Sequence, residues 1–102
     1  MGKFKVLKDF FQTQNETVVG GKLISGKIKV DIYGKVTRNG EVIGKVKLTS
    51  IKDQQNEIKE TDEKGEYGIK LKKLAINDKI KIDDIIEFYV ISHISKKVQK
   101  IS

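Results

Sequence analysis

The sequence has no cysteine, no proline and no tryptophan, and it has one histidine and one arginine among its 102 residues. The lack of cysteine excludes disulfide bonds and thiolate metal sites, so the hydrophobic core must stabilise the fold unaided. His93 has no second histidine with which to bind a metal, and it is the only histidine that can serve the serines as a base. We therefore expect no metal site, no cofactor and no enzymatic activity.

Long apolar runs are also missing. No segment approaches the roughly 18 consecutive apolar residues of a membrane-spanning helix, and the N-terminus lacks the apolar region of a signal peptide. We expect a chain that is neither inserted in a membrane nor anchored to one.

Positive charge is plentiful. Lysine and arginine total 21 residues against 14 acidic ones, which gives a formal net charge of +7. Such a charge favours a polyanionic partner, because lysines that contact phosphates release counterions. The lysines are spread along the chain, so a lysine-rich solvated surface explains them equally well. A stacking platform for bases would need Tyr33, Tyr67 or Tyr89, whose alternative role is packing with the hydroxyl at the rim.

Alternating polar and apolar residues predict strands along most of the chain. Asn39-Gly40 suits a two-residue hairpin turn with positive φ. After the turn, we expect the inward face of the next strand to carry Val42, Val46 and Leu48.

Further strands are predicted at 3–8, 17–24, 67–71 and 85–91. Gly20-Gly21 interrupts the second of them, which indicates a bulge or the close approach of a backbone or ligand. Six or seven short strands with no helix long enough to cover a sheet predict an all-β barrel or sandwich. We expect a single domain over 1–102 with its core at about 3–91, and either a tail or a short helix at 92–102.

One segment imitates a nucleotide-binding motif. Residues 21–28 match the phosphate-binding loop pattern through Gly26-Lys27. Ile28 stands where a hydroxyl group is needed to hold Mg²⁺, and no long helix follows. A strand and a turn are the better interpretation, so we predict no nucleotide binding.

Four segments in a fixed order resemble the C-terminal domain of bacterial translation initiation factor two. They are GKIK at 26–29, VTRNGEVIGKVKLTSIK at 36–52, GEYGIKL at 65–71 and IKIDDIIEFY at 80–89. The resemblance covers the chain from about Phe4 to Val90. It implies a six-stranded antiparallel β-barrel like the second domain of elongation factor Tu.

The resemblance also implies a function. The family's domain binds the formylmethionyl acceptor end of initiator tRNA during initiation on the ribosome, and a separate upstream domain of the same protein handles GTP. A cytoplasmic, monomeric protein is expected on this basis.

Seven positions are implied to form the tRNA-end site: Gly21, Lys52, Asp53, Gln54, Glu66, Tyr67 and Gly68. Lys52, Glu66 and Gly68 match the family pattern, and the other four depart from it. Asp53 replaces an arginine, and a carboxylate beside phosphate costs on the order of 1 to 3 kcal/mol of binding. Asp83 replaces a glycine in a turn, and one additional residue precedes Asp78. The departures leave an alternative function open, a diverged barrel that acts as a structural or protein-docking module.

Overall fold

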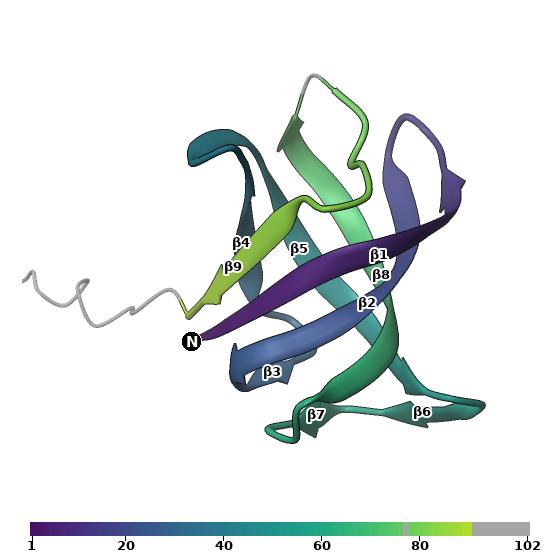
Figure 1. The fold of residues 1–102 in the computed structure, drawn as a ribbon. Coiled ribbons are helices and arrows are strands. Elements are labelled where there is room, and N and C mark those ends of the chain that lie inside the picture. The colour runs from purple at the N-terminus through teal and green to yellow at the C-terminus, as the bar shows by residue number, and fades with distance from the viewer. Residues whose placement is uncertain (77, 91–102) are drawn as a thin grey trace, which may run out of the picture.

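The computed structural model describes residues 1–76 and 78–90, so the predicted tail or helix at 92–102 lies outside the described residues. The described part contains nine strands and no helix, which confirms the all-β prediction (Figure 1). The strands are β1 (Gly2–Gln12), β2 (Glu16–Gly26), β3 (Ile28–Lys29), β4 (Tyr33–Arg38), β5 (Glu41–Asp53), β6 (Asn56–Ile58), β7 (Glu60–Thr61), β8 (Gly65–Ile76) and β9 (Ile85–Tyr89).

Six of these strands close into a barrel. Their order is β4-β9-β1-β2-β8-β5, and β5 pairs again with β4 to complete the ring. Every pairing in the ring is antiparallel. β6 extends from β5 outside the ring, and β3 and β7 form a small second sheet at the lower end in Figure 1. The predicted six-stranded antiparallel barrel is confirmed.

The barrel interior is filled by the inward residues of the alternating strands. Phe4 and Phe88 are among the largest fully buried side chains, and Ile69 and Leu71 of β8 point inward as predicted. Closure of the ring removes the open sheet edges, so the backbone groups of the long strands are paired within the barrel.

The hairpin between β4 and β5 corrects one prediction. Its turn is as expected, since Asn39 and Gly40 have φ of 55° and 83°. Val42, however, is 54% exposed and does not point into the core. A β-bulge inserts Ile43 between two successive cross-strand pairs, so the alternation changes face at that point. Ile43 packs against the core in place of Val42.

Gly21 confirms the predicted close approach of a backbone. It pairs with Val6 of β1, and a Cβ atom built on it would collide with the Lys5 carbonyl and the Phe4 ring. A bulge in β1 follows directly, since the next paired residue after Val6 is Lys8. Only glycine fits here, because the obstructing atoms include backbone that cannot rotate away.

The single arginine links β4 to the β8–β9 connection through hydrogen bonds. Arg38 donates from Nε to Asp84 Oδ1 at 2.8 Å and from Nη2 to Asp84 Oδ2 at 2.9 Å. It also donates from Nη1 to Asp78 at 2.8 Å and from Nη2 to the Lys79 carbonyl at 2.9 Å. Asp84 is only 2% exposed. The hydrogen bonds to Asp84 and Asp78 raise the pKa of Arg38, and the bond from Arg38 lowers the pKa of Asp78.

Candidate functional site

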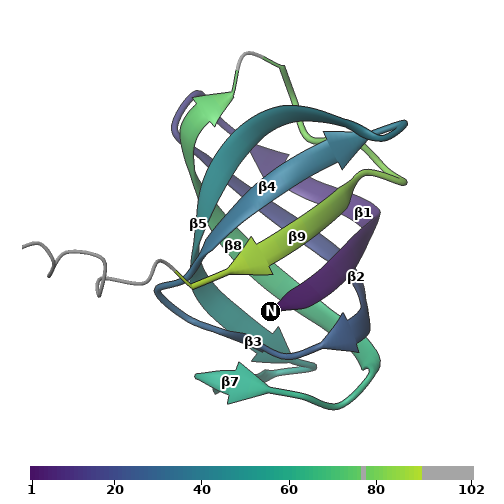
Figure 2. The same cartoon turned by 90° about the vertical axis from the view of Figure 1, so that its left-hand side faces the viewer.

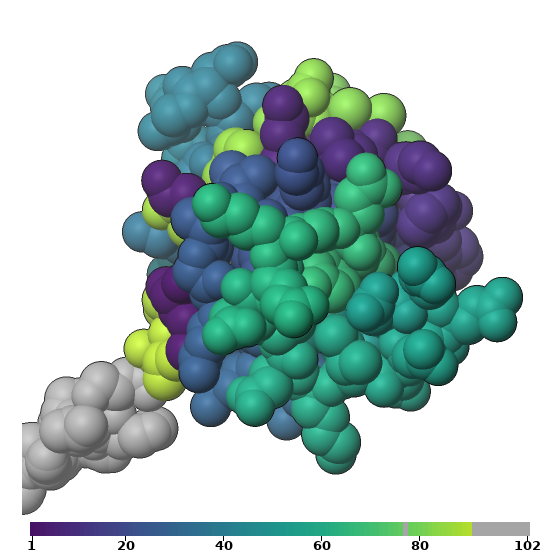
Figure 3. Space-filling view, turned by 60° about the horizontal axis from the view of Figure 1, so that its bottom comes forward, coloured from purple at the N-terminus to yellow at the C-terminus, as the bar shows by residue number. Residues whose placement is uncertain are grey.

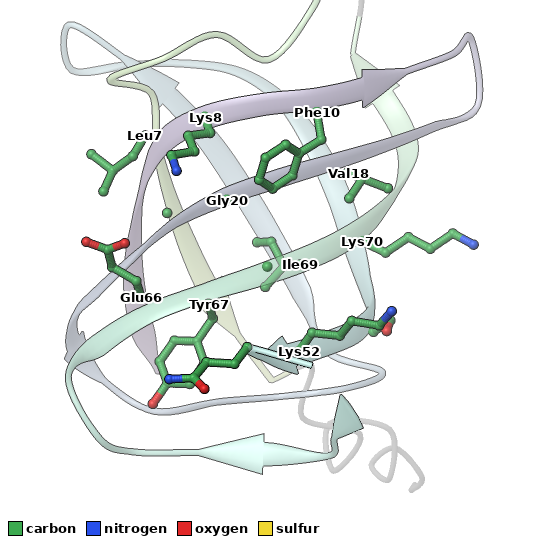
Figure 4. A pocket seen from close by; sticks show the side chains of 14 residues that line it. Leu7, Lys8, Phe10, Val18, Gly20, Lys52, Glu66, Tyr67, Ile69 and Lys70 are labelled. Carbon is green, nitrogen blue, oxygen red and sulfur yellow. The ribbon is translucent and has the colours of Figure 1, made fainter. Parts of the chain in front are cut away.

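A groove of about 600 Å³ lies on the outer surface of β1, β2, β8 and β5 (Figure 4). Its lining residues come from four strands and the β5–β6 turn. They are Leu7, Lys8, Phe10, Val18, Gly20, Gly21, Ser50, Lys52, Gln54, Glu66, Tyr67, Gly68, Ile69 and Lys70. Figure 4 shows Lys8 and Phe10 along one side of the groove and Lys52 along the other.

Two glycines form the floor of the groove and make the groove deeper. Gly20 of β2 and Gly68 of β8 are directly opposite each other in the ladder. A Cβ built on Gly68 would meet nothing within 4 Å, and one built on Gly20 would lie 3.0 Å from the Phe10 ring. The missing side chains therefore create the hollow, and they allow a ligand to approach the backbone closely.

Positive charge dominates the rim. Lys8, Lys52 and Lys70 line the groove, against the single carboxylate of Glu66. Lys70 Nζ lies 3.8 Å from the Glu16 carboxylate, an exposed ion pair that is worth little in water. Among the described residues, Lys8 and Lys52 form no ion pair. Their ammonium groups are therefore available to an anionic ligand.

The groove brings together six of the seven positions implied by the resemblance. These are Gly21, Lys52, Gln54, Glu66, Tyr67 and Gly68. They come from β2, from the end of β5 and its following turn, and from the start of β8. These segments lie far apart in the sequence, and the β2–β8 and β5–β8 ladders place them side by side.

Asp53 is the exception, because it does not line the groove. Ser50 and Lys52 of β5 face the groove, while Ile51 between them is fully buried. The alternation therefore puts Asp53 on the other face of the strand from Lys52, and in the β5–β6 ladder its register partner is Asn56. The β5–β6 hairpin projects beyond the neighbouring strands in Figures 1 and 3.

Tyr67 closes the lower end of the barrel. Its side chain is 7% exposed, and its hydroxyl donates to the Glu63 carbonyl at 2.8 Å and lies 2.9 Å from Thr61 Oγ1. This confirms the predicted role of packing with the hydroxyl at the rim. The ring borders the groove but is too enclosed to serve as an open stacking platform.

Phe10 is a groove residue that the sequence reasoning missed. It is 60% exposed, and its neighbour Phe11 is 53% exposed. Two adjacent aromatic residues in a strand point to opposite faces, so at least one must leave the core. A bulge between Asp9 and Phe11 exposes both. The Phe10-Phe11 pair itself was the available signal, since adjoining exposed apolar side chains form a patch, and patches mark binding surfaces more often than single exposed residues do.

The described part of the chain offers no metal centre and no membrane-spanning helix. Within 1–76 and 78–90, no group of three or more histidine or acidic side chains is placed to hold a metal ion. The same ranges contain no helix of the length and apolar character needed to cross a membrane.

Comparison with known proteins agrees with the resemblance of the four segments. The chain is 36% identical over 90 residues to translation initiation factor IF-2 of Ureaplasma parvum, 34% over 92 residues to that of Streptococcus thermophilus and 31% over 97 residues to that of Thermosipho africanus. The chain is a homologue of part of translation initiation factor IF-2. These matches cover 88%, 89% and 95% of this chain.

The similarity is confined to a domain-sized part of the factor. The chain spans 14%, 9% and 14% of the length of these IF-2 proteins, in the same order. No family model matches the sequence. The homology and the fold together make the chain a β-barrel domain of a translation initiation factor.

Proposed function

We propose that the groove binds the formylmethionyl acceptor end of initiator tRNA during initiation of translation. The observation that carries the proposal is the groove itself, which gathers six of the implied positions over a floor of two glycines. The homology to IF-2, from whose resemblance these positions were taken, also supports it. In this proposal the barrel acts in the cytoplasm as a monomeric domain at the ribosome, and an upstream domain of the same protein handles GTP.

The groove offers each contact that an aminoacylated RNA end requires. Lys8 and Lys52 contact the terminal phosphates, because neither has a carboxylate partner among the described residues. The exposed Phe10 ring stacks on an unpaired base, an interaction worth about 1–3 kcal/mol per base. Glu66 accepts a hydrogen bond from a ribose hydroxyl, which distinguishes RNA from DNA. The Gly20–Gly68 floor leaves space for the esterified amino acid.

The test is a fluorescence anisotropy titration of the full chain against fluorescently labelled formylmethionyl initiator tRNA and, in parallel, against the same labelled tRNA uncharged. We expect tighter binding of the charged form. Lys52→Gln should weaken binding about fivefold near 0.1 M salt, because one phosphate contact contributes about 0.7 to the salt slope. Lys64→Gln is the matched control, since Lys64 is exposed and lies in the turn before β8, away from the groove. Equal affinity for charged and uncharged tRNA would refute initiator recognition.

The alternative, a structural or protein-docking module, rests on the departures at Gly21, Asp53, Gln54 and Tyr67. It predicts that charged and uncharged tRNA bind equally weakly. It also predicts that Asp53→Arg restores no tRNA binding. A gain in affinity for charged tRNA in Asp53→Arg would exclude this alternative.

A further inference from the structure

A second surface lies on the opposite side of the barrel from the groove. β4 and β9 stand at its centre, and they are opposite β2 and β8 in the six-strand ring (Figure 2). Register pairing aligns one row of outward residues across four strands. The row consists of Lys3 of β1, Glu87 of β9, Lys35 of β4 and Lys45 of β5.

This row places like charges against each other. Lys35 and Lys45 are direct cross-strand partners, an arrangement that destabilises an antiparallel pair. Among the described residues, neither lysine forms an ion pair, and Glu87 forms none with Lys3 or Lys35. A hollow of about 450 Å³ runs along the row and is lined by all four of these residues. The Lys35–Lys45 contact is therefore unfavourable, and the row holds three lysines against one carboxylate, Glu87, which the ladder places between Lys3 and Lys35.

The adjacent row carries aromatic rings. Tyr33 of β4 pairs with Tyr89 of β9 on one side and with Lys47 of β5 on the other. The two tyrosine rings have centroids 6.4 Å apart at an interplanar angle of 33°. Lys47 Nζ lies 5.7 Å from the centroid of the Tyr33 ring, within cation–π distance. Both tyrosines are only half-buried, so ring surface remains open to a ligand.

We infer that this face, formed by Lys3, Lys35, Lys45, Lys47, Tyr33 and Tyr89, binds single-stranded RNA. Lysines beside half-exposed tyrosines match the two needs of a single strand, phosphate neutralisation and base stacking. Phosphates between Lys35 and Lys45 remove the repulsion that the free protein carries, and counterion release adds to the affinity. A protein partner is disfavoured, because lysine is depleted in protein–protein interfaces. The inference does not depend on the proposed function of the groove, since the two surfaces share none of these residues.

The test uses a labelled oligouridine of about twelve nucleotides, within the range that single-strand-binding barrels cover. The face variant is the triple Lys35→Gln, Lys45→Gln, Lys47→Gln in the full chain. Its control is the triple Lys64→Gln, Lys79→Gln, Lys81→Gln, which removes the same charge from exposed positions that line neither the hollow of the lysine row nor the one beside Tyr33. Three lost phosphate contacts should weaken binding about a hundredfold near 0.1 M salt and lower the salt slope by about 2.

The control triple should retain affinity within about threefold, since only general charge is lost. Equal loss in the two triples, or unchanged affinity in the face triple, would overturn the inference. Removal of the Lys35–Lys45 repulsion should leave the melting temperature of the face triple unchanged or raised, so weaker binding cannot be attributed to unfolding.

Two single variants distinguish binding on this face from binding in the groove. Tyr33→Leu should weaken oligouridine binding at least fivefold, the equivalent of about 1 kcal/mol of stacking. Lys52→Gln in the groove should leave it unchanged. If Lys52→Gln abolished binding while the face triple did not, the RNA would lie in the groove and the inference would be wrong. The inference is also wrong if polyglutamate of equal charge displaces the oligouridine as effectively as unlabelled RNA does.

Discussion

Replacement of Arg38 by methionine should be one of the most destabilising changes available on the surface of this barrel. Methionine has a similar reach but no hydrogen-bond donor. The change removes both bonds to Asp84, at 2.8 and 2.9 Å, and leaves that carboxylate 2% exposed with the Lys81 amide, at 2.8 Å, as its remaining hydrogen-bond donor. Removal of one partner from a buried ion pair costs about 3–5 kcal/mol, because the remaining charge stays desolvated.

This loss of unfolding free energy is large for a domain of this size. Small domains are stable by about 5–15 kcal/mol, so the loss takes a large part of the total. The melting temperature should fall by more than about 10 °C. Urea unfolding followed by far-ultraviolet circular dichroism measures the change, since the chain has no tryptophan to report it by fluorescence.

A double variant tests whether the cost comes from the unpaired charge of Asp84. If the cost arises from an unpaired buried charge, Arg38→Met combined with Asp84→Asn should be more stable than Arg38→Met alone, because asparagine carries no charge to desolvate. Asp78→Asn is the matched control, since the Asp78 side chain is 51% exposed and its loss should have little effect. A loss below about 1 kcal/mol in Arg38→Met, or no recovery in the double variant, would show that Asp84 is adequately solvated without arginine.

Three other predictions concern stability. Asp83 has a φ of 79°, which is unfavourable for a residue with a Cβ atom, so Asp83→Gly should raise stability by up to about 1 kcal/mol, measured as a higher melting temperature. A lower melting temperature would mean that the Asp83 side chain stabilises the turn. Arg38 lowers the pKa of Asp78 below 3.8, so their pairing stabilises the fold fully above that pH and the contribution is lost as pH falls through the lowered pKa. Acid titration of Asp78→Asn should therefore show a shallower loss of stability. Gly21→Ala should lower the free energy of unfolding by more than about 2 kcal/mol, because the added methyl collides with backbone. The control Gly68→Ala should fold normally, and equal denaturation midpoints for the two variants would contradict this prediction.

Most of the fold was predictable because strand alternation has a period of two and the barrel has one buried face. Tyr67, Ile69 and Leu71 follow this pattern without interruption, and all three are buried. Val42 was mispredicted because a bulge adds a residue to one strand and changes the face of everything on one side of it. Such a bulge arises from how two strands pair, so the residue pattern of one strand does not reveal it.

The candidate site was predictable only through the resemblance of the four segments. Lys52, Glu66 and Gly68 could be named because they match a motif, and the structure places them in one groove. Phe10 and Lys8 belong to no motif, so their part in the groove came from the structure. Asp53 was assigned to the site by the same resemblance, as the residue that stands where the family has arginine, but it does not line the groove, because adjacent residues of a strand face opposite sides.

The sequence by itself determined the all-β class, the hairpin turn at Asn39-Gly40 and the relation to translation initiation factor IF-2, because these depend on local patterns and on matched residues. Only the tertiary structure decided which residues share a surface. Pairing of β2 with β8 sets Gly20 opposite Gly68 on one side of the barrel, and the bulge in the β4–β5 hairpin sets Lys35 opposite Lys45 on the other. Neighbours across a barrel are set by the register and the bulges of each strand pair, and those quantities arise only when the strands pair.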